Sequence, residues 1–371
     1  MIFNVLNDGE PQSASTRSVL SVVRKHGPLP RSEITGHLSL SQQSVHRIVD
    51  SLIEQNMLTL LEPTISGRGK PSPRVALDQT THVSFGLSIG TEQARVCGLD
   101  LTGRPLFTHD LVSKPNHCDE VREEFRAVTA DWVARSRTAV AVVGAGIAMQ
   151  GYRRGQHDVF YPPRPLDSWQ EISVNQFFSE TTALPFYSEN NATSSAIAEY
   201  YLGSVAPIAS LAYLSFNFGF GSGLVVRGDP ATGTHGNAGE ISSIFEGDQI
   251  RARPALEGLL RVVTDDANPT PRHLKEVLTA LDVSDEKVRH WVDWVAPQLR
   301  LAIRALKAIA DPSAIVFGGE APHELRLRLV EASRSAFGEQ SSPNPTLVAS
   351  RLEGDPAHLG AAFLPLHRHL F

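Results

Sequence analysis

A run of polar side chains near residue 45 has the chemistry needed to bind DNA. Serine, glutamine, histidine and arginine side chains hydrogen-bond to base edges and to phosphates. The run consists of Ser41, Gln42, Gln43, Ser44, His46 and Arg47. Because serine is a favourable helix N-cap, Ser41 predicts that these side chains lie at the exposed start of a helix, as in a recognition helix that enters the major groove.

The neighbouring segments predict the elements that position this run. Apolar residues recur behind it at helical spacing, at Val45, Ile48, Val49, Leu52 and Ile53. A short helix opening at Pro30 precedes it across a turn at residues 39–41, and a first helix over residues 17–25 stops before Pro28. Two short helices joined by a tight turn form a helix-turn-helix.

A basic loop follows the predicted recognition helix. Two strands predicted at residues 57–61 and 74–77 flank a loop that contains Arg68 and Lys70. Such a loop resembles a wing that reaches phosphates or the minor groove. A surface helical hairpin with a solvated basic loop is the alternative. DNA binding is favoured because turn, amphipathic helix, strand pair and basic tip follow one another in the order of a winged helix-turn-helix.

Charge is distributed unevenly along the chain. The whole chain carries −6, but the segment from Pro11 to Ala76 has eight basic and four acidic residues, which leaves +4 there and −10 elsewhere. A basic head on an acidic body is expected when only one domain meets phosphate. The asymmetry therefore supports DNA binding by the N-terminal segment.

Length and composition limit the class of protein. With 371 residues, 41% of them hydrophobic, the chain can bury the cores of about two or three domains. It has no apolar stretch of about 18 residues and no N-terminal signal pattern, so we expect a soluble, cytoplasmic protein without a membrane partner. Two cysteines, Cys97 and Cys118, exclude a disulfide framework and a site of three or four thiolates.

From Thr81 onward, short apolar runs alternate with glycine turns and helical segments. The first half predicts strands at residues 83–90, 94–100 and 106–107, a helix at 120–134 and a buried strand at 139–147. The second half predicts strands at 184–187, 210–216, 218–226 and 314–319, with helices at 192–202 and 286–310. Two repeats of strands followed by helices predict an α/β body of two lobes with a cleft between them.

Six motifs of the body occur in a specific order. They are Gly146–Gly151, Glu189–Ala192, Gly219–Gly223, Gly233–Glu240, Ile315–Gly319 and Leu359–Ala362. In this order, and over nearly the whole chain from about residue 15, they resemble the ROK family of bacterial sugar kinases and sugar-responsive repressors. The resemblance implies an actin-like ATPase fold with sugar between the lobes, preceded in the repressors by a winged helix-turn-helix. Dimers or tetramers are common in the family.

Two positions depart from the kinases of that family. Their catalytic base is an aspartate where this chain has Asn191, whose amide cannot accept a proton. Their phosphate-side Asp-x-Gly turn begins here with Ser88, which brings no charge to hold magnesium. The run Gly219–Gly223 remains, and either nucleotide binding or strand packing accounts for it. We therefore expect no phosphoryl transfer.

The resemblance also assigns sugar contacts and argues against a zinc site. The family's zinc-binding histidine falls on Ser243, and no cysteine lies between Arg251 and Glu257, so we expect no metal and no cofactor. The sugar-facing positions implied are Gly151, Asn190, Asn191, Glu240, Ser243 and Glu257. Glu257 is placed by matching residues 255–257 to a family motif. For each carboxylate, a surface or helix-capping role is the alternative.

These observations predict an α/β protein of two parts. Residues 1–78 form a winged helix-turn-helix, and residues 79–371 form a two-lobed, actin-like ROK domain, with the C-terminal helix a candidate to return to the first lobe. The predicted function is a sugar-responsive transcriptional regulator, with repression as the expected mode. Its expected partners are operator DNA, a sugar or sugar phosphate, and further copies in a homodimer or homotetramer. A carbohydrate kinase with an added DNA-binding head is the second hypothesis, and a protein-binding scaffold is the third.

Overall fold

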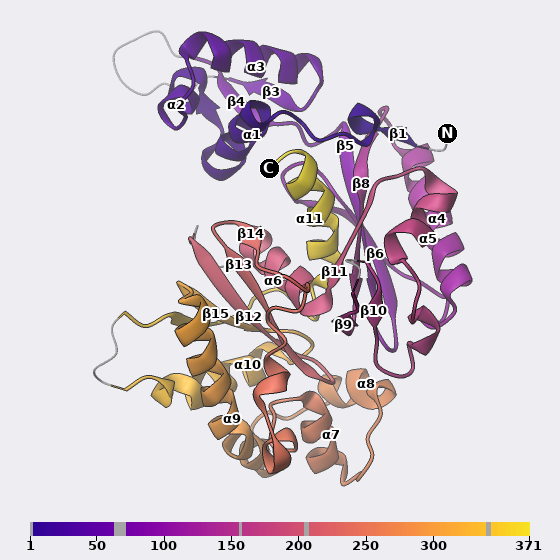
Figure 1. Cartoon of the computed structure of the whole chain (residues 1–371), viewed down its shortest axis with the longest axis vertical. Coiled ribbons are helices and arrows are strands. Elements are labelled where there is room, and N and C mark those ends of the chain that lie inside the picture. The colour runs from indigo at the N-terminus through magenta and orange to yellow at the C-terminus, as the bar shows by residue number, and fades with distance from the viewer. Residues whose placement is uncertain (1–2, 63–71, 156–157, 204–207, 339–342) are drawn as a thin grey trace.

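The computed structural model describes residues 3–62, 72–155, 158–203, 208–338 and 343–371. It consists of a small N-terminal head and two larger lobes built around separate sheets (Figure 1). The expected basic loop with Arg68 and Lys70 lies outside the described residues. Within the described part of the chain, no helix is both long and apolar enough to cross a membrane.

The head combines three helices with a small antiparallel sheet. The helices are α1 (Ala14–His26), α2 (Arg31–Gly36) and α3 (Gln42–Glu54), and the strands β2 (Leu29–Pro30), β4 (Arg74–Leu77) and β3 (Leu58–Leu61) pair in that order. Helix α3 begins where the sequence predicts, since the Ser41 hydroxyl accepts a hydrogen bond from the Ser44 amide at 3.1 Å. Its apolar residues Val45, Val49 and Leu52 are buried in the core. The predicted helices and strand pair are confirmed.

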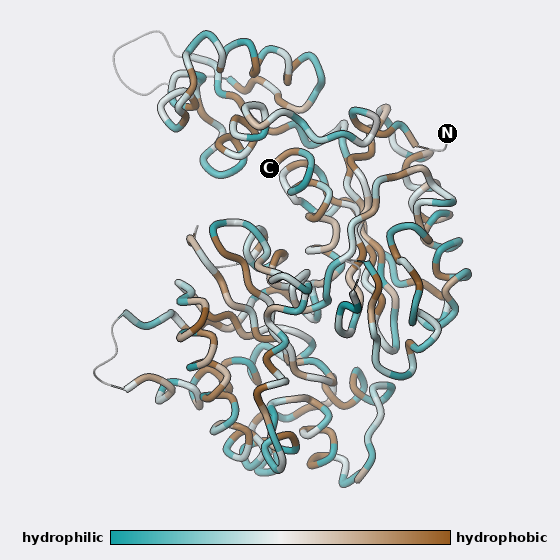
Figure 2. The backbone as a smooth tube through the Cα atoms, viewed as in Figure 1, coloured by the Kyte–Doolittle hydropathy of each residue, from teal (hydrophilic) through white to brown (hydrophobic). Residues whose placement is uncertain are grey.

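The first lobe is built on a mixed, six-stranded sheet. Its longer strands are β5 (His82–Ile89), β6 (Ala94–Leu99), β7 (Pro105–Asp110), β8 (Ala141–Met149) and β11 (Phe186–Asn190), and helices α4 (Cys118–Arg135) and α5 (Val174–Thr182) cover one face (Figure 1). Strands β5, β6 and β7 form an antiparallel meander, while β8 runs parallel to both β5 and β11. Hydrophobic segments concentrate in the central strands β5 and β8 (Figure 2), because both faces of the sheet are covered there, whereas the edge strand β7 is largely exposed.

The first described residues join this sheet instead of the head. Strand β1 (Asn4–Val5) pairs in parallel with the start of β8, and Phe3 is buried beside Phe85. A 3-10 helix, η1 (Leu6–Gly9), leads from there toward α1. The expected division, with residues 1–78 in the head, therefore differs from the structure at its N-terminal end, because these apolar residues complete the core of the first lobe.

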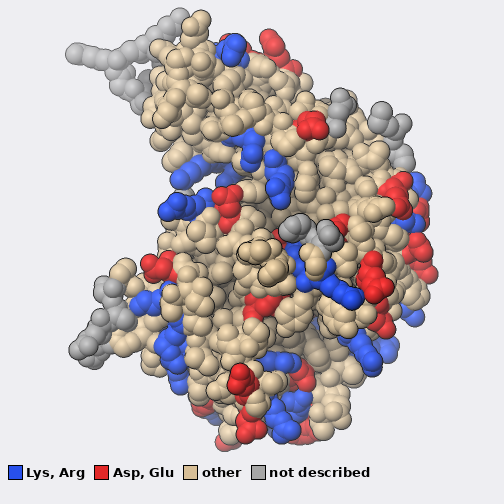
Figure 3. All heavy atoms as spheres, in the orientation of Figure 1, with Lys and Arg blue, Asp and Glu red and all other residues tan. Residues whose placement is uncertain are grey.

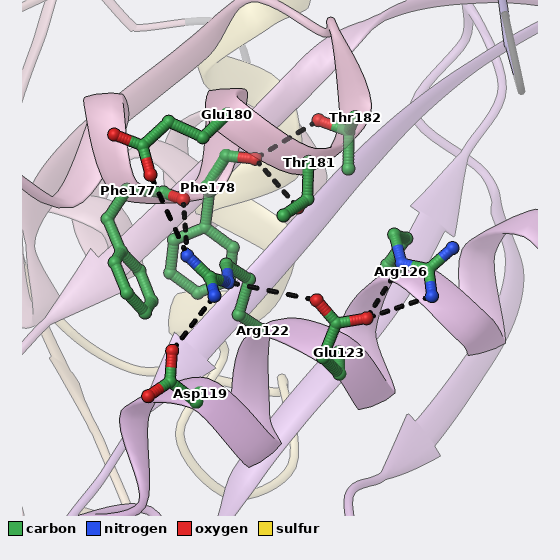
Figure 4. Close-up of polar contacts among 9 residues, drawn as sticks. All are labelled: Asp119, Arg122, Glu123, Arg126, Phe177, Phe178, Glu180, Thr181 and Thr182. Carbon is green, nitrogen blue, oxygen red and sulfur yellow. Dashed lines mark hydrogen bonds and ion pairs between the residues drawn. The ribbon is translucent and has the colours of Figure 1, made fainter.

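Helices α4 and α5 are tied together through Arg122 (Figure 4). Its guanidinium lies 4.1 Å from the ring centre of Phe177 on α5 and 2.8 Å from the carboxylate of Asp119 on α4. The segment that leads into α5 contains η2 (Asp167–Trp169), where the buried Trp169 indole donates to the Pro115 carbonyl at 2.7 Å. Trp169 and Phe177 therefore anchor the segment that leads into α5 and the helix itself.

The second lobe has a five-stranded sheet in the order β14-β13-β12-β15-β16. The strands are β12 (Ser210–Phe216), β13 (Phe220–Val226), β14 (Asp229–Pro230), β15 (Ala314–Gly318) and β16 (Thr346–Ala349). The helices are α7 (Leu256–Thr264), α8 (Leu274–Thr279), α9 (Glu286–Ala310) and α10 (His323–Ser333), with short 3-10 helices η3 (Ile241–Ile244), η4 (Gly247–Ile250), η5 (Pro271–His273) and η6 (Arg334–Ala336). Trp291 of α9 shares a buried core with Phe216 and Phe317 of the sheet. The predicted helix at 286–310 is confirmed.

Helices α6 (Asn191–Leu202) and α11 (Ala357–His369) pack against each other between the two sheets (Figure 1). Glycine permits this close packing. A Cβ on Gly146 of β8 would lie 1.8 Å from the Ala361 carbonyl oxygen, and a Cβ on Gly360 of α11 would lie 1.6 Å from the Ser194 carbonyl oxygen. The C-terminal helix thus returns to the first lobe, and helix packing explains the glycines in two of the sequence motifs.

Candidate functional site

A cavity of about 1410 Å³ opens between the two lobes. Its walls come from the β5–β6 turn, the start of α6, the β12–β13 turn, the loop before η3, helices α7 and α8, and a ribbon formed by β9 (Tyr152–Arg153) and β10 (Phe160–Tyr161). The volume exceeds the roughly 300–1000 Å³ that is common for small-molecule pockets. Five of the six expected sugar-facing residues line it, namely Gly151, Asn190, Asn191, Glu240 and Glu257.

Asn190 holds Glu240 in the cavity. Its side-chain amide donates to Glu240 Oε1 at 3.1 Å and to the Gly151 carbonyl at 2.9 Å. Its side-chain oxygen accepts from the Ala192 amide at 2.8 Å, which makes Asn190 the N-cap of α6. Both amide protons are therefore used within the protein. The structure brings these predicted residues together and gives Asn190 the role of orienting the carboxylate.

The Glu240 carboxylate is poorly solvated. Burial raises the pKa of Glu240 to about 7, because desolvation disfavours the charged form. Gly239, just before it, has φ +96°, and a Cβ there would lie 2.8 Å from the Ser222 carbonyl oxygen, so glycine lets the loop pass close to β13. A desolvated carboxylate in a cavity is suited to accept hydrogen bonds from ligand hydroxyl groups, which replace the water lost on burial.

Asn191 meets Asp355 beside the start of α6. Asn191 Nδ2 donates to Asp355 Oδ2 at 2.5 Å, and Asn217, just after β12, donates to the same oxygen at 2.7 Å. Ser195 Oγ and the Ala357 amide donate to the other oxygen at 2.7 and 3.1 Å. Asp355 therefore joins α6, the second-lobe sheet and the first turn of α11. The amide at the position expected for a kinase base has a partner within the protein.

The glycine run after β12 has two roles. A Cβ on Gly223 would lie 2.4 Å from the Ala192 carbonyl oxygen, so this glycine admits the first turn of α6. Gly219 and Gly221 line the cavity, and the space around Gly219 is open. Ser88, near the end of β5, lines the same cavity. Packing thus accounts for Gly223, while the two other glycines border space that a ligand can fill.

Ser243 and Glu257 differ from the other expected sugar contacts. Ser243 is exposed outside the cavity and its hydroxyl donates to the Glu240 carbonyl at 2.7 Å, because η3 buries Ile241 and turns Ser243 outward. This corrects the expected sugar contact of Ser243. The Glu257 carboxylate lines the cavity but pairs with Arg253 at 3.1 Å and Arg261 at 2.7 Å. A sugar contact by Glu257 stays a prediction, and it would compete with these ion pairs.

The contacts that support the site could not be read from the sequence, although Asn237 and Glu189 lie within two of its motifs. The Asn237 side chain accepts from the Arg153 amide at 2.7 Å and donates to the Arg153 carbonyl at 3.0 Å. The Arg153 guanidinium lies 3.1 Å from Glu189, so these contacts join the β9–β10 ribbon to the loop that ends in Glu240. Asn237 lies 84 residues from Arg153, and Asp355 lies 164 residues from Asn191. Spacing along the chain therefore could not reveal these pairs.

The two cysteines lie outside the cavity. Cys97 is buried on β6 and Cys118 begins α4. Burial raises the pKa of Cys97 far above its usual range. Among the residues that the structure describes, no group of three His, Cys, Asp or Glu side chains is arranged to hold a metal ion. The described cavity wall instead offers amides, hydroxyls, carboxylates and basic side chains.

The candidate DNA-binding side chains lie at the start of α3. Gln42, Gln43 and Arg47 are exposed, and Ser44 and His46 are partly exposed. The Ser41 and Ser44 hydroxyls lie 2.8 Å apart at the helix N-terminus. Arg47 borders a groove of about 420 Å³ that it shares with the start of α1. These side chains are therefore accessible on the part of α3 that a recognition helix inserts into DNA.

The head contacts the C-terminal end of α11. Arg17 of α1 donates to the Phe371 carbonyl at 2.7 Å, and the Arg24 guanidinium lies 5.0 Å from the ring centre of Phe371 and 4.3 Å from that of Tyr201 on α6. Burial lowers the pKa of Arg24, and the aromatic ring supplies part of the lost solvation. Figure 3 shows basic side chains gathered where the head faces the lobes. Helix α11, whose first residue Ala357 donates to Asp355, thus runs from the cavity wall to the head.

Comparison with known proteins agrees with this geometry. Residues 84–246 match the model of the ROK family. A putative xylose repressor from Caldicellulosiruptor sp. is 21% identical over 345 residues, which cover 86% of each chain. A ROK family transcriptional regulator, a homolog of the E. coli MLC protein, has a crystal structure that matches with a TM-score of 0.72 at 17% identity over 96% of both chains. A ROK family glucokinase from Streptomyces griseus, in complex with glucose and AMPPNP, gives a TM-score of 0.59 at 20% identity over 76% of this chain and 98% of its own.

Residues 84–246 therefore match the ROK family, and the chain has the mixed α/β, actin-like fold of the ROK regulator and sugar kinase structures. Its homologues include transcriptional regulators and a repressor, while kinases share the fold.

Proposed function

We propose that the protein is a sugar-responsive transcriptional repressor whose cavity binds a sugar or sugar phosphate without phosphorylating it. The head acts as a winged helix-turn-helix with α3 as the recognition helix. The observation that carries the proposal is the continuous contact from Asn191 through Asp355 and α11 to the head. A kinase needs no such connection between its sugar site and an N-terminal head.

The chemistry of the site argues against phosphoryl transfer. That reaction needs a base for the attacking hydroxyl and a carboxylate near the metal. Asn191 carries an amide that donates to Asp355, and Ser88 carries no charge. Asp355 itself accepts four hydrogen bonds, so it would have to break one of them to take a proton from a sugar. Glu240 remains as an acceptor for sugar hydroxyl groups.

Helix α11 supplies a route from the cavity to the head. Its 13 residues span about 20 Å. Asn191 and Asn217 reach Asp355 from different elements around the cavity, so lobe closure on a ligand would shift Asp355 and the helix that follows it. At the far end, Arg17 holds the Phe371 carbonyl. In a dimer or tetramer, this shift would change the spacing of two heads and hence the affinity for paired half-sites.

Two measurements test the proposal. Thermal-shift screening against monosaccharides and their phosphates would identify the ligand, because a ligand that binds the native state raises its stability. The identified sugar should then change the affinity for operator DNA in gel-shift titrations, and a coupled assay should detect no ATP-dependent phosphorylation of it. Sugar-dependent ATP turnover would instead support a carbohydrate kinase with an added head, a function that the open space at Gly219 favours.

A further inference from the structure

We propose that Tyr152 and Tyr161 form a platform for the second ring of a disaccharide or glycoside, so that the effector is larger than a monosaccharide. This inference rests on the proposed function, since it names the class of sugar that the same cavity binds. Two sugar rings would then lie in the cavity, the first near Glu240 and the second on the tyrosines.

The two tyrosines share one face of the β9–β10 ribbon. Tyr152 pairs directly with Tyr161 in antiparallel register, which puts both side chains on the same side. Arg153 and Phe160 form the neighbouring pair on the opposite side, where both are buried and the guanidinium lies 4.9 Å from the ring centre. The buried pair anchors the ribbon to the lobe. On the other face, the Arg154 guanidinium lies 5.9 Å from the ring centre of Tyr161, and both tyrosines stay about half exposed.

Both tyrosines present aromatic surface to the cavity. Tyr152 is 48% exposed and Tyr161 is 51% exposed, and both line the cavity wall. An exposed aromatic pair within a cavity is typical of a surface that a ligand covers. A pyranose ring suits it, because its C–H bonds form apolar faces while its hydroxyl groups point outward to polar side chains. Arg164 and Gln170 line the same cavity and can serve as such hydrogen-bonding partners.

The platform is continuous with the Glu240 site. Gly151 directly precedes Tyr152, and its carbonyl accepts from the same Asn190 amide that donates to Glu240. A Cβ on Gly151 would lie 2.3 Å from the Tyr161 carbonyl oxygen, so glycine allows the ribbon to close next to this site. A ligand held at Glu240 and extending past Gly151 meets the tyrosines next.

The size of the cavity agrees with an extended ligand. Its volume of about 1410 Å³ lies above the roughly 1000 Å³ of large small-molecule pockets, so a single sugar ring would leave most of it to water. The Arg122 and Trp169 contacts fix the segment after the ribbon, which keeps this part of the wall in place before the ligand arrives. Preorganised aromatic walls favour binding because little conformational entropy is lost.

Calorimetric titration with matched sugar pairs tests the inference. The probes are xylose with xylobiose, glucose with cellobiose and maltose, and N-acetylglucosamine with its β-1,4 dimer. One disaccharide should bind the full-length protein at least about tenfold more tightly than its monosaccharide, a difference of about 1.4 kcal/mol. The double variant Tyr152→Ala, Tyr161→Ala should lose that advantage and keep the monosaccharide affinity within about twofold. The double phenylalanine variant should retain the advantage, because it keeps the aromatic faces.

Controls separate this inference from other causes. Trp294→Ala removes an aromatic side chain that is 40% exposed on α9, away from the cavity, and should leave both affinities unchanged. A preference for the disaccharide that survives the double alanine variant would overturn the platform. The platform would also be overturned if the double alanine variant lost monosaccharide and disaccharide affinity equally, or if it changed its oligomeric state while both sugar affinities stayed unchanged. Monosaccharide binding without any gain from the second ring overturns this inference alone, whereas no binding of any carbohydrate overturns the proposed function as well.

Discussion

Replacing Asn191 by aspartate would restore the residue type of a kinase base, and we expect it to destabilise the protein without creating a kinase. The wild-type amide donates to Asp355 Oδ2 at 2.5 Å. Asn191→Asp removes a hydrogen bond to a charged group, which contributes about 1.5–3 kcal/mol. It also sets two carboxylates against each other, and two unit charges about 3 Å apart repel by about 5 kcal/mol at an effective dielectric constant of about 20. Allowing for relaxation, we expect a net loss of about 2–4 kcal/mol at pH 8.

The pH dependence identifies the cause. Repulsion by Asp355 raises the pKa of the new carboxyl group in the folded state, so the folded protein favours its protonated form. The destabilisation should therefore be small near pH 5, where a protonated carboxyl can still donate to Asp355, and should grow as the pH rises to 8. Thermal melting of wild type, Asn191→Asp and Asn191→Ala at both pH values measures this. The alanine variant loses the hydrogen bond but adds no charge, so its deficit should not grow with pH.

The reasoning would be refuted by an Asn191→Asp variant that is as stable as wild type at pH 8. Sugar-dependent ATP turnover by that variant would refute the structural role of Asn191 in the same way.

Three further predictions concern the sugar, the DNA and their coupling. Glu240→Gln should weaken sugar binding about tenfold or more at pH 8 (about 1.4 kcal/mol per decade) without changing DNA affinity in the absence of sugar. Because the Glu240 pKa is about 7, the sugar affinity of the wild type should fall as the pH drops from 8 to 6, and calorimetry at both pH values checks this. Arg47→Ala should weaken operator binding by about 1–3 kcal/mol, and Arg68→Ala should lower the salt dependence of binding, as gel-shift titrations at several salt concentrations would reveal. Arg24→Ala removes the guanidinium that lies over Tyr201 of α6 and Phe371 after α11; it should leave sugar affinity unchanged but reduce the effect of sugar on DNA affinity. Alanine at the exposed neighbour Lys25 should leave that effect intact, and equal behaviour of the two variants would exclude this contact between head and lobes as the route.

The sequence predicts the elements that have strong local signals. Ser41 and the helical spacing behind it locate α3 to within a residue, since capping and amphipathicity are properties of neighbouring residues. The long helix α9 and the buried strands β8 and β12 follow from periodicity and length in the same way. Short elements without periodicity, such as β1 and the β9–β10 ribbon, give no such signal. Strand β1 forms only by pairing with the distant β8, and the two-residue strands of the ribbon are too short to show a period.

The site is predictable only in part for the same reason. Motif matching found Gly151, Asn190 and Glu240, which the structure brings together. It did not find Asp355 or the two tyrosines, because their roles depend on pairing across the sheet and between lobes. It also misplaced Ser243, since a match by position does not reveal that η3 turns this side chain out of the cavity.

The measurement that tests the central claim most directly is DNA binding with and without sugar, followed by fluorescence anisotropy on a duplex that the protein selects from a random pool. With saturating sugar from the thermal-shift screen and ATP present, we expect the Kd for this duplex to change at least about tenfold, or about 1.4 kcal/mol. We also expect no ADP to form in the same sample. A Kd that no bound sugar alters, or sugar-dependent formation of ADP, would contradict the account of a regulator that senses sugar without phosphorylating it.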